Sequence, residues 1–173
     1  MQLNTKRKSG SILAAQAYIR LKLLTGLWLG DLLRITMSDI QEDGLHVTPR
    51  KTESTTGKTI IYAWSDELRG AVALAKSVRP REISPYLFCT LKGECYFKEN
   101  GRAGGWESLW RNFMARVFAE TQVTERFTEH DLRAKCASDA DSLAHAQQLL
   151  GHADSKVTQR VYRRKAEIVQ PLR

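Results

Sequence analysis

The sequence predicts an α+β domain that is mostly α-helical and carries one small antiparallel sheet, formed by a β-hairpin. Apolar residues recur at helical spacing over several long segments, which predicts amphipathic helices. Two segments rich in β-branched and aromatic residues flank a short polar turn, which predicts the hairpin. With 173 residues and 42% hydrophobic content, the chain has the size and composition of one globular domain.

The N-terminal part begins with residues 1–10, which are polar and basic and are typical of a linker or a cloning-derived end. Ser11 is a suitable N-cap for a helix over residues 12–24, because apolar residues recur there every three or four positions. Thr25-Gly26 interrupts this pattern, and a second short helix is expected over residues 29–35.

The predicted hairpin consists of the segments GLHVTPRK and TIIYAWS, which are joined by the polar segment TESTTG. We expect a mobile tip there, since the joining segment is short, polar and contains glycine. Pro49 lies late in the first strand and has no backbone N–H, so the strand should end or lie at an edge there.

The remainder of the chain is expected to be rich in helices. Ser65, followed by two acidic residues, opens a helix that runs to about Val78. The segment YLFCT is interpreted as a short buried strand, and KGECYFKENGRAGG as a long irregular loop. Further helices are predicted over residues 106–121, from about His130, over residues 143–150 and over residues 155–161. We expect the folded domain over residues 11–165 and a C-terminal tail over residues 166–173.

The charge and cysteine content indicate the class of partner and compartment. A net charge of +8 and a sequence pI of about 9.6 favour a polyanionic partner, of which nucleic acid is the usual one. Cys89, Cys95 and Cys136 have neither zinc-site spacing nor an even number, which is typical of free thiols in a reducing cytoplasm. No apolar run approaches the roughly 20 residues that a membrane span needs, and we expect no targeting segment.

Four polar residues near the C-terminus indicate chemistry on a phosphate group: His130, Arg133, His152 and Tyr162. A tyrosine hydroxyl can attack phosphorus, while arginine and histidine can stabilise the oxygens that become more negative during the attack. Each residue singly has an ordinary explanation, such as packing of Tyr162 against a helix or a surface position for Arg133. Their joint order and spacing favour the functional interpretation.

The segment TEHDLRAKCASDADSLAHAQQLLGHADSKVTQRVYRRK resembles the C-terminal motif of the tyrosine recombinases, the phage integrase family. That motif reads H-x-x-R, then L-G-H, then a tyrosine, and His130, Arg133, His152 and Tyr162 match it. Upstream, LLTGLWLGDLLRITMSDI resembles the first motif of the family, and VTPRKTESTTGKTIIYAW resembles its lysine-bearing hairpin. The resemblance covers about residues 12–165 and implies the catalytic-domain fold of a tyrosine recombinase.

The resemblance also implies a role for each residue. Tyr162 would attack the scissile phosphate and form a 3′-phosphotyrosyl link, which the 5′-hydroxyl of a second strand then attacks; no metal or other cofactor is implied. Arg133 would donate two parallel hydrogen bonds to non-bridging oxygens. His130 would accept or orient the tyrosine proton, and His152 would donate to a phosphate oxygen. Lys51 would protonate the leaving 5′-oxygen, entering the site only when DNA is bound.

Other basic residues are assigned by their places in these segments. Lys51 is preferred over Lys58 as the general acid, because RKT at the end of the first strand resembles the strand-end lysine of the family. Arg50 and Lys58 would then contact backbone phosphates. The basic residues around the tyrosine would either do the same or form a solvated tail; they are Arg160, Arg163, Arg164 and Lys165.

The first motif departs from the family at Trp28. The family has T-G-x-R, whereas this chain has Thr25-Gly26-Leu27-Trp28, so an indole occupies the position of the first catalytic arginine. An indole carries no charge and one N–H donor, and loss of one transition-state donor lowers a rate by roughly 10²–10³. Asp31, which would normally help to hold that arginine, is left without its expected partner.

Three explanations for Trp28 remain open. The chain could be a naturally degenerate integrase, or it could carry a substitution relative to a parent protein that has the arginine. Alternatively, Arg20, Arg34 or Arg50 could reach into the site and replace the missing charge.

The sequence therefore predicts site-specific DNA recombination, in the integration or excision of a phage or prophage, with activity weakened by Trp28. Two alternatives are a catalytically inactive DNA-binding module on the same fold and a type IB topoisomerase, which shares this chemistry. The expected partner is double-stranded DNA in the cytoplasm of a bacterial cell. The resemblance implies a homotetramer on DNA for a full-length protein, and we expect this piece to be mostly monomeric by itself.

Overall fold

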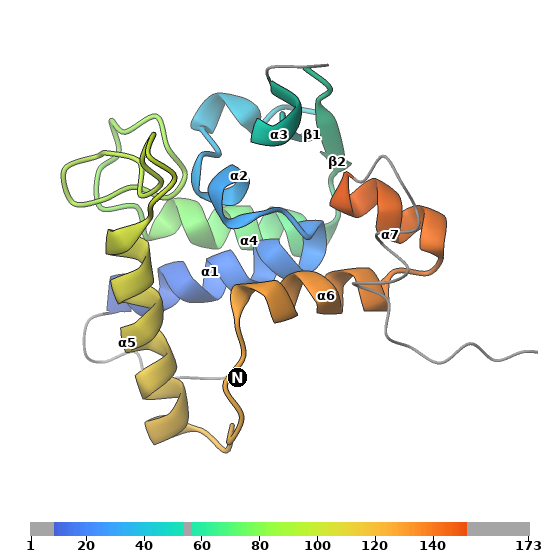
Figure 1. Ribbon diagram of the computed structural model, residues 1–173. Coiled ribbons are helices and arrows are strands. Elements are labelled where there is room, and N and C mark those ends of the chain that lie inside the picture. The colour runs from blue at the N-terminus through green and yellow to red at the C-terminus, as the bar shows by residue number, and fades with distance from the viewer. Residues whose placement is uncertain (1–8, 54–56, 152–173) are drawn as a thin grey trace, which may run out of the picture.

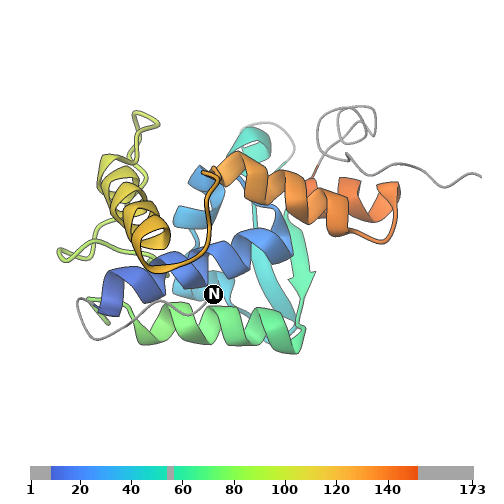
Figure 2. The ribbon, with the colours of Figure 1, turned by 90° about the horizontal axis from the view of Figure 1, so that it is seen from below.

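The computed structural model describes residues 9–53 and 57–151, and α1 (Ser9–Thr25) lies at the centre of the fold. Helix α1 contacts α4 (Asp66–Ser77), α5 (Gly104–Glu120) and α6 (Glu129–Asp139) (Figure 1). Both ribbon views place α1 and α4 side by side, with α5 at one end of the pair and α6 along the other side of α1 (Figure 2). The predicted helix over residues 12–24 is confirmed, and it begins before Ser11.

The main core forms where α1 meets α4, α5 and the hairpin. Tyr18 is fully buried and packs its ring 4.6 Å from that of Trp106 and 5.9 Å from that of Phe88, measured between ring centroids. Removing such large aromatic surfaces from water is the dominant favourable contribution to folding. The indole Nε1 of buried Trp106 has no hydrogen-bond partner among the described residues. Other buried members of this core are Leu21, Leu32, Leu33, Leu45, Leu68, Val72 and Leu87.

A tight turn follows α1 and leads into the short helix α2 (Leu29–Leu33). Gly26 ends α1 with a φ of +63°, a conformation that residues with a side chain rarely adopt. A methyl group added there would come within 2.5 Å of Leu150 Cδ2 and 3.2 Å of Cys136 Sγ. Glycine is therefore needed both for the backbone conformation and for the close approach of the C-terminal helices.

The predicted hairpin is confirmed, but the segment between its strands differs from the expectation. Strand β1 (Gly44–Val47) pairs antiparallel with β2 (Ile60–Ala63). The first strand ends before Pro49, and residues 50–53 form a short helix, α3 (Arg50–Glu53). Proline is favoured at the start of a helix, where its missing N–H is not needed. The expectation that Lys51 ends a strand is therefore wrong, because Lys51 lies in α3.

Residues 86–90, predicted as a buried strand, instead form an irregular segment against the core. Tyr86 and Cys89 make isolated bridges with Thr36 and Cys95. Leu87 is buried there because it packs against the main core, without a neighbouring strand. The apolar segment thus predicted burial correctly and secondary structure wrongly. The 3-10 helix η1 (Met37–Asp39) lies close by and begins with a capping box from Thr36.

The predicted C-terminal helices are confirmed as far as the structure describes them. Helix α6 begins with a capping box in which Thr128 and Asp131 bond to each other's backbone N–H, and α7 (Leu143–Leu150) begins with the Ser142 hydroxyl as its cap. Gly151 ends α7 with a φ of +63°. The helix predicted over residues 155–161 lies outside the described residues. Within residues 9–53 and 57–151, no helix has the length and apolar character needed to cross a membrane.

Candidate phosphate-binding site

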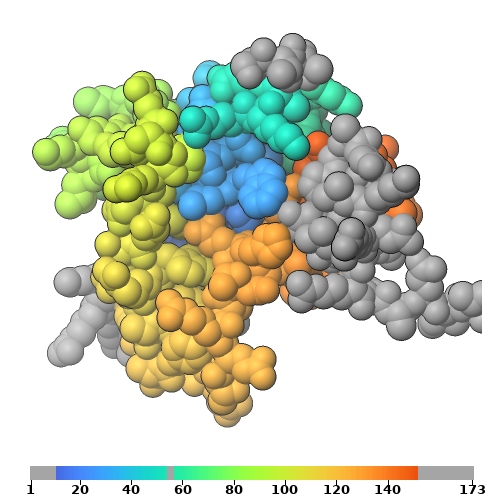
Figure 3. All heavy atoms as spheres, in the orientation of Figure 1, coloured from blue at the N-terminus to red at the C-terminus, as the bar shows by residue number. Residues whose placement is uncertain are grey.

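The candidate site lies where the turn after α1, the first part of α6 and the end of α7 meet. In the space-filling view, the blue segment around residue 30 and the orange segment around residue 130 adjoin on one face, below the teal segment near residue 50 (Figure 3). We call the turn at Gly26, α6 and the end of α7 the inner half of the site. We call α2, α3 and the hairpin the outer half.

Arg133 is the centre of the inner half, and it is buried, with only 1% of its surface exposed. Its Nη1 donates to the carbonyl oxygen of Gly26, and its Nη2 donates to that of Leu150 at 3.0 Å. These bonds join the end of α1 to the end of α7 through a side chain of α6. In this arrangement the guanidinium group holds backbone carbonyls, whereas the sequence predicted that it donates to a phosphate.

Trp28 covers the Arg133 guanidinium. The Arg133 Cζ lies 4.4 Å from the centroid of the Trp28 ring, a cation–π distance. The Trp28 side chain itself is 47% exposed, so it separates the arginine from solvent on this side. The indole that stands at the position of the family's first arginine thus covers Arg133, which matches the second arginine of the family motif.

His130 lies in the first turn of α6, three residues before Arg133 and on the same side of the helix. Its ring centroid is 6.3 Å from that of Trp28. The capping box of α6 fixes the start of this turn. His130 is exposed, in contrast to Arg133. The predicted neighbourhood of His130, Arg133 and the Trp28 position is therefore present in the structure.

Asp31 lacks its expected arginine partner, as predicted, but it has a different partner that the sequence did not indicate. Its Oδ1 accepts a hydrogen bond from the backbone N–H of Arg50 at 2.9 Å, which ties α2 to the start of α3. Burial raises the pKa of the Asp31 carboxyl, while the Arg50 N–H and the nearby charges of Arg34, Arg133 and Lys22 oppose that rise. The carboxylate thus has a structural role even though no arginine stands at position 28.

The outer half is held by contacts near the surface. Lys51 and Lys58 are both exposed. Arg34 donates from Nη1 and Nη2 to the two carboxylate oxygens of Glu53, at 3.1 and 3.4 Å, and so links α2 to α3. This pair lowers the pKa of Glu53. The segment that carries Lys51 is therefore docked on α2 by one buried contact from Asp31 and one exposed ion pair.

The three arginines considered as replacements for the missing charge contact or line other parts of the molecule. Arg34 is paired with Glu53, as described above. The guanidinium of Arg50 stacks on the ring of Phe97 at 5.6 Å, and its Nη2 donates to the carbonyl of Glu99 at 3.5 Å. Arg20 is exposed and lines an outer groove of about 370 Å³ together with Phe127 and other residues of α1 and α6.

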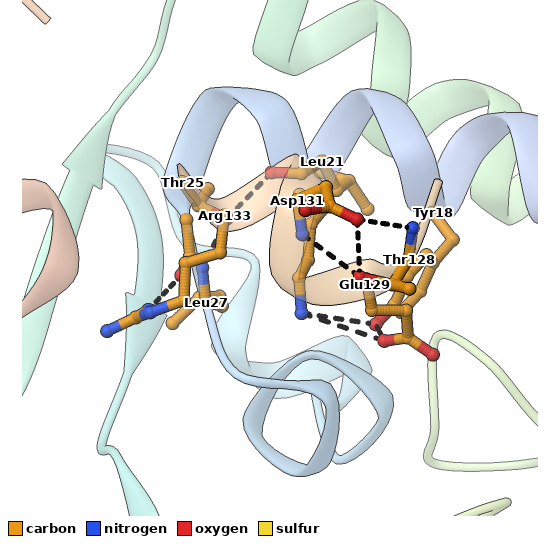
Figure 4. Close-up of polar contacts among 10 residues, drawn as sticks. Tyr18, Leu21, Thr25, Leu27, Thr128, Glu129, Asp131 and Arg133 are labelled. Atoms are coloured by element: carbon orange, nitrogen blue, oxygen red, sulfur yellow. Dashed lines mark hydrogen bonds and ion pairs between the residues drawn. The ribbon is translucent and has the colours of Figure 1, made fainter. Parts of the chain in front are cut away.

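A buried lysine that the sequence interpretation did not single out, Lys22, interacts electrostatically with Arg133. Lys22 is 2% exposed, and its Nζ lies 3.6 Å from Glu129 Oε2 and 3.5 Å from the hydroxyl of Tyr18. The Tyr18 hydroxyl also donates to Glu129 Oε2 (Figure 4). Burial lowers the pKa of Lys22 to about 8, and Arg133 contributes to the decrease, while Glu129 opposes it. The feature of the sequence that could have identified this buried lysine is its position inside the apolar segment LKLL.

The remaining predicted residues fall beyond the described part of the chain. They are His152, Tyr162, Arg160, Arg163 and Arg164, and Lys165 lies there too. Their assigned roles therefore stay predictions. Within the described ranges, no group of three or more His, Cys, Asp or Glu side chains is arranged to hold a metal ion.

Comparisons with known proteins agree with this fold. The family model described as the phage integrase family matches residues 2–167. A crystal structure of a lambda integrase dimer bound to a core site has a TM-score of 0.62 and 22% identity, covering 98% of this chain and 62% of that one. The XerA recombinase has a TM-score of 0.68 and 20% identity, with 96% and 60% covered.

The integrase of transposon Tn1549, in complex with transposon right end DNA, gives a TM-score of 0.60 and 17% identity, with 95% and 62% covered. The chain thus spans about three fifths of the length of these solved proteins. A search of curated proteins finds no match. The fold is that of a tyrosine recombinase catalytic domain, and the extent of the family match shows that this chain belongs to the phage integrase family.

Proposed function

We propose that this chain is the catalytic domain of an integrase that cuts and rejoins DNA during integration or excision of a phage or prophage. The observation that carries this proposal is the convergence of three motifs that are far apart in the sequence. The turn before Trp28, the helix with His130 and Arg133, and the end of α7 before His152 meet at one site. Membership of the integrase family supports the same reaction.

In the proposed reaction, the phenol oxygen of Tyr162 attacks phosphorus and the bond from phosphorus to the 5′-oxygen breaks. The phenol gives up its proton, with His130 as the proposed acceptor, and the 5′-oxygen takes a proton from Lys51. A 5′-hydroxyl then reverses the step and restores the phosphodiester. Double-stranded DNA is the proposed partner, bound by the site and by Arg50 and Lys58 in the outer half.

We further propose that Trp28 weakens cleavage in two ways. It removes one cationic donor, and it stacks on the guanidinium of the other arginine, so a phosphate can reach Arg133 only after the indole moves. Arg133 must also exchange its bond to a backbone carbonyl for one to phosphate. Both changes weaken binding of the transition state relative to the substrate, and catalysis depends on that difference.

The test uses nicked suicide duplexes with a randomised core, on which a covalent protein–DNA adduct accumulates and is seen on denaturing gels. We expect a weak adduct for the natural chain, and one stronger by roughly 10²–10³ for Trp28→Arg. Tyr162→Phe is the control and should give no adduct. If Trp28→Arg gives no more adduct than the natural chain, the proposed role of Trp28 is wrong.

The second candidate function is a DNA-binding module without cleavage activity, and the covered state of Arg133 favours it specifically. It predicts duplex binding that weakens steeply with salt, because cationic side chains release counterions from DNA. Salt-sensitive binding without any adduct, even in Trp28→Arg, would support this candidate. An adduct that depends on Tyr162 would exclude it.

A further inference from the structure

We propose that Lys22 and Glu129 form a buried positioning pair for the phosphate site, holding the start of α6 and setting the charge beside Arg133. Neither residue needs to touch the phosphate. The inference deepens the proposed function and rests on it in so far as the site binds a phosphate group.

The geometry of the pair connects the central helix with the catalytic helix. Lys22 belongs to the last turn of α1, and Glu129 is the first residue of α6, directly before His130. Tyr18 lies one turn before Lys22 and donates to the same carboxylate oxygen that faces the lysine (Figure 4). Two side chains of α1 thus hold the first residue of α6.

Burial of this lysine is unfavourable enough to suggest a role beyond packing. Taking an ammonium group out of water is costly, and a well-packed apolar pair is often at least as stable as a buried ion pair. The lysine also lies beside aromatic surface, since its Nζ is 5.7 Å from the centroid of the Tyr18 ring, which packs against Trp106 and Trp110. A lysine here therefore indicates that its charge serves the neighbouring site.

The charged and titratable groups around Lys22 come from three helices. Tyr18 lies on α1, Asp31 on α2, and Glu129 and Arg133 on α6. Cys136 of α6 also interacts with the lysine charge. Lys22 and Arg133 are the two cations of this group, and Glu129 and Asp31 are its carboxylates.

A change in the charge of Lys22 would reach the site directly. With a pKa of about 8, the ammonium group loses its proton in mildly alkaline solution. The Glu129 carboxylate then lacks its cationic partner beside His130, and one positive charge near Arg133 disappears. The affinity of the site for an oxyanion should therefore fall as the pH rises through about 8, since like charges repel in a medium of low dielectric constant.

Two neighbouring groups, Cys136 and Tyr18, have pKa values above this range. Burial raises the pKa of Cys136 to about 11 and that of Tyr18 well above its ordinary value. A chain's α-amino group ordinarily titrates at about 8, so the assignment to Lys22 requires a variant that lacks only this lysine.

The first measurement follows the full chain by NMR from pH 6.5 to 9.5, through the indole N–H of Trp28 and the backbone amides of residues 129–133. We expect one transition near pH 8 in the natural chain. Lys22→Met should abolish it. Glu129→Gln should move it to lower pH, because the carboxylate is what favours the charged lysine. The same transition in Lys22→Met would overturn the inference.

The matched control is Lys135→Met. Lys135 lies in α6 itself, but it is exposed and pairs with Asp139 at 2.7 Å on the surface. Its removal should leave the transition unchanged. If Lys22→Met does not fold, the Cε signal of Lys22 in the natural chain decides the matter. Titration of that signal near the ordinary lysine value of about 10.4 would overturn the inference.

The second measurement is binding of sulfate, a tetrahedral dianion whose charge is constant over this pH range. We expect sulfate to bind the natural chain several-fold more weakly at pH 9 than at pH 7, and Lys22→Met to bind it equally at both. Equal binding by the natural chain, or no binding, would refute the effect on the site. If the NMR transition near pH 8 is present but the chain forms no DNA adduct, the proposed recombination activity is wrong. The proposed role of the Lys22–Glu129 pair would still hold.

Discussion

The inner and outer halves of the site are held together by different interactions. In the inner half, Arg133 is buried and bonds to two backbone carbonyls, and Lys22 and Glu129 form a largely buried ion pair. In the outer half, α3 is attached to α2 by the exposed pair of Arg34 and Glu53 and by the hydrogen bond from the Arg50 N–H to the buried Asp31 carboxylate. The inner half is joined through desolvated charges, whereas the outer half combines one buried carboxylate contact with an ion pair that water and salt weaken.

This difference indicates which part of the site can move. Breaking a buried charged contact leaves an unsatisfied group and is strongly unfavourable, whereas an exposed ion pair exchanges readily with water. The residues after Arg50, which include Lys51 and Glu53, could therefore move away from α2 towards bound DNA while the contact between Asp31 and the Arg50 N–H stays in place. Such a movement is what the proposed role of Lys51 as general acid requires.

The largest expected effect is that of Arg133→Met, which tests the inner half. The change leaves the carbonyls of Gly26 and Leu150 without these donors inside the protein, and we expect a loss of about 3–5 kcal/mol in the free energy of unfolding. Urea denaturation measures this value. Arg116→Met, which removes an exposed pair with Glu120 on α5, is the control and should change stability little. If both variants lose the same free energy of unfolding, the inner half is not held more strongly than an exposed ion pair.

The next effect is a dependence of stability on pH that originates from Lys22. Its pKa is lowered in the folded state, so above pH 8 the unfolded chain binds more protons than the folded one, and stability rises with pH. Between pH 7 and 9.5 this contribution amounts to about 2 kcal/mol. The difference between the natural chain and Lys22→Met, measured by denaturation at several pH values, isolates it. A difference that is constant with pH would show that Lys22 does not titrate in this range.

The smallest effect is expected for Arg34→Met in the outer half. Because the ion pair with Glu53 is exposed, we expect a decrease in Tm of only about 1–2 °C at low ionic strength. The decrease should vanish in about 0.5 M NaCl, where charges on the surface are screened. Thermal denaturation at two salt concentrations measures this. A large decrease in Tm that salt does not reduce would show that the pair of Arg34 and Glu53 is as strong as the buried contacts of the inner half.

Much of this architecture could be predicted from the sequence, because α4 and α5 have regular apolar spacing, α1 is rich in apolar residues, and α4 and α6 have clear caps. His130 and Arg133 were found from the H-x-x-R pattern that resembles the family motif, and a three-residue spacing places both on one side of a helix. The hairpin was also found, although Pro49 indicated a helix start that was not recognised.

What could not be predicted depends on contacts between distant residues. Nothing near Lys22 in the sequence reveals that Glu129 is its partner, and nothing near Asp31 indicates the N–H of Arg50. The contact between Arg133 and Trp28 likewise joins residues that are far apart in the sequence. The apolar segment YLFCT was correctly predicted to be buried but wrongly predicted to be a strand. A short apolar run predicts burial, but it does not reveal whether a neighbouring strand is available for pairing.

The close contact at Gly26 has a consequence for the order of events during synthesis. Gly26 touches Leu150 and Arg133, which follow it by more than a hundred residues. Contacts between residues so far apart form late, because the intervening chain must first be ordered. A nascent chain on the ribosome therefore has no assembled phosphate site until nearly all of this domain has emerged. The proposed site for DNA cleavage thus stays incomplete while the chain is being made.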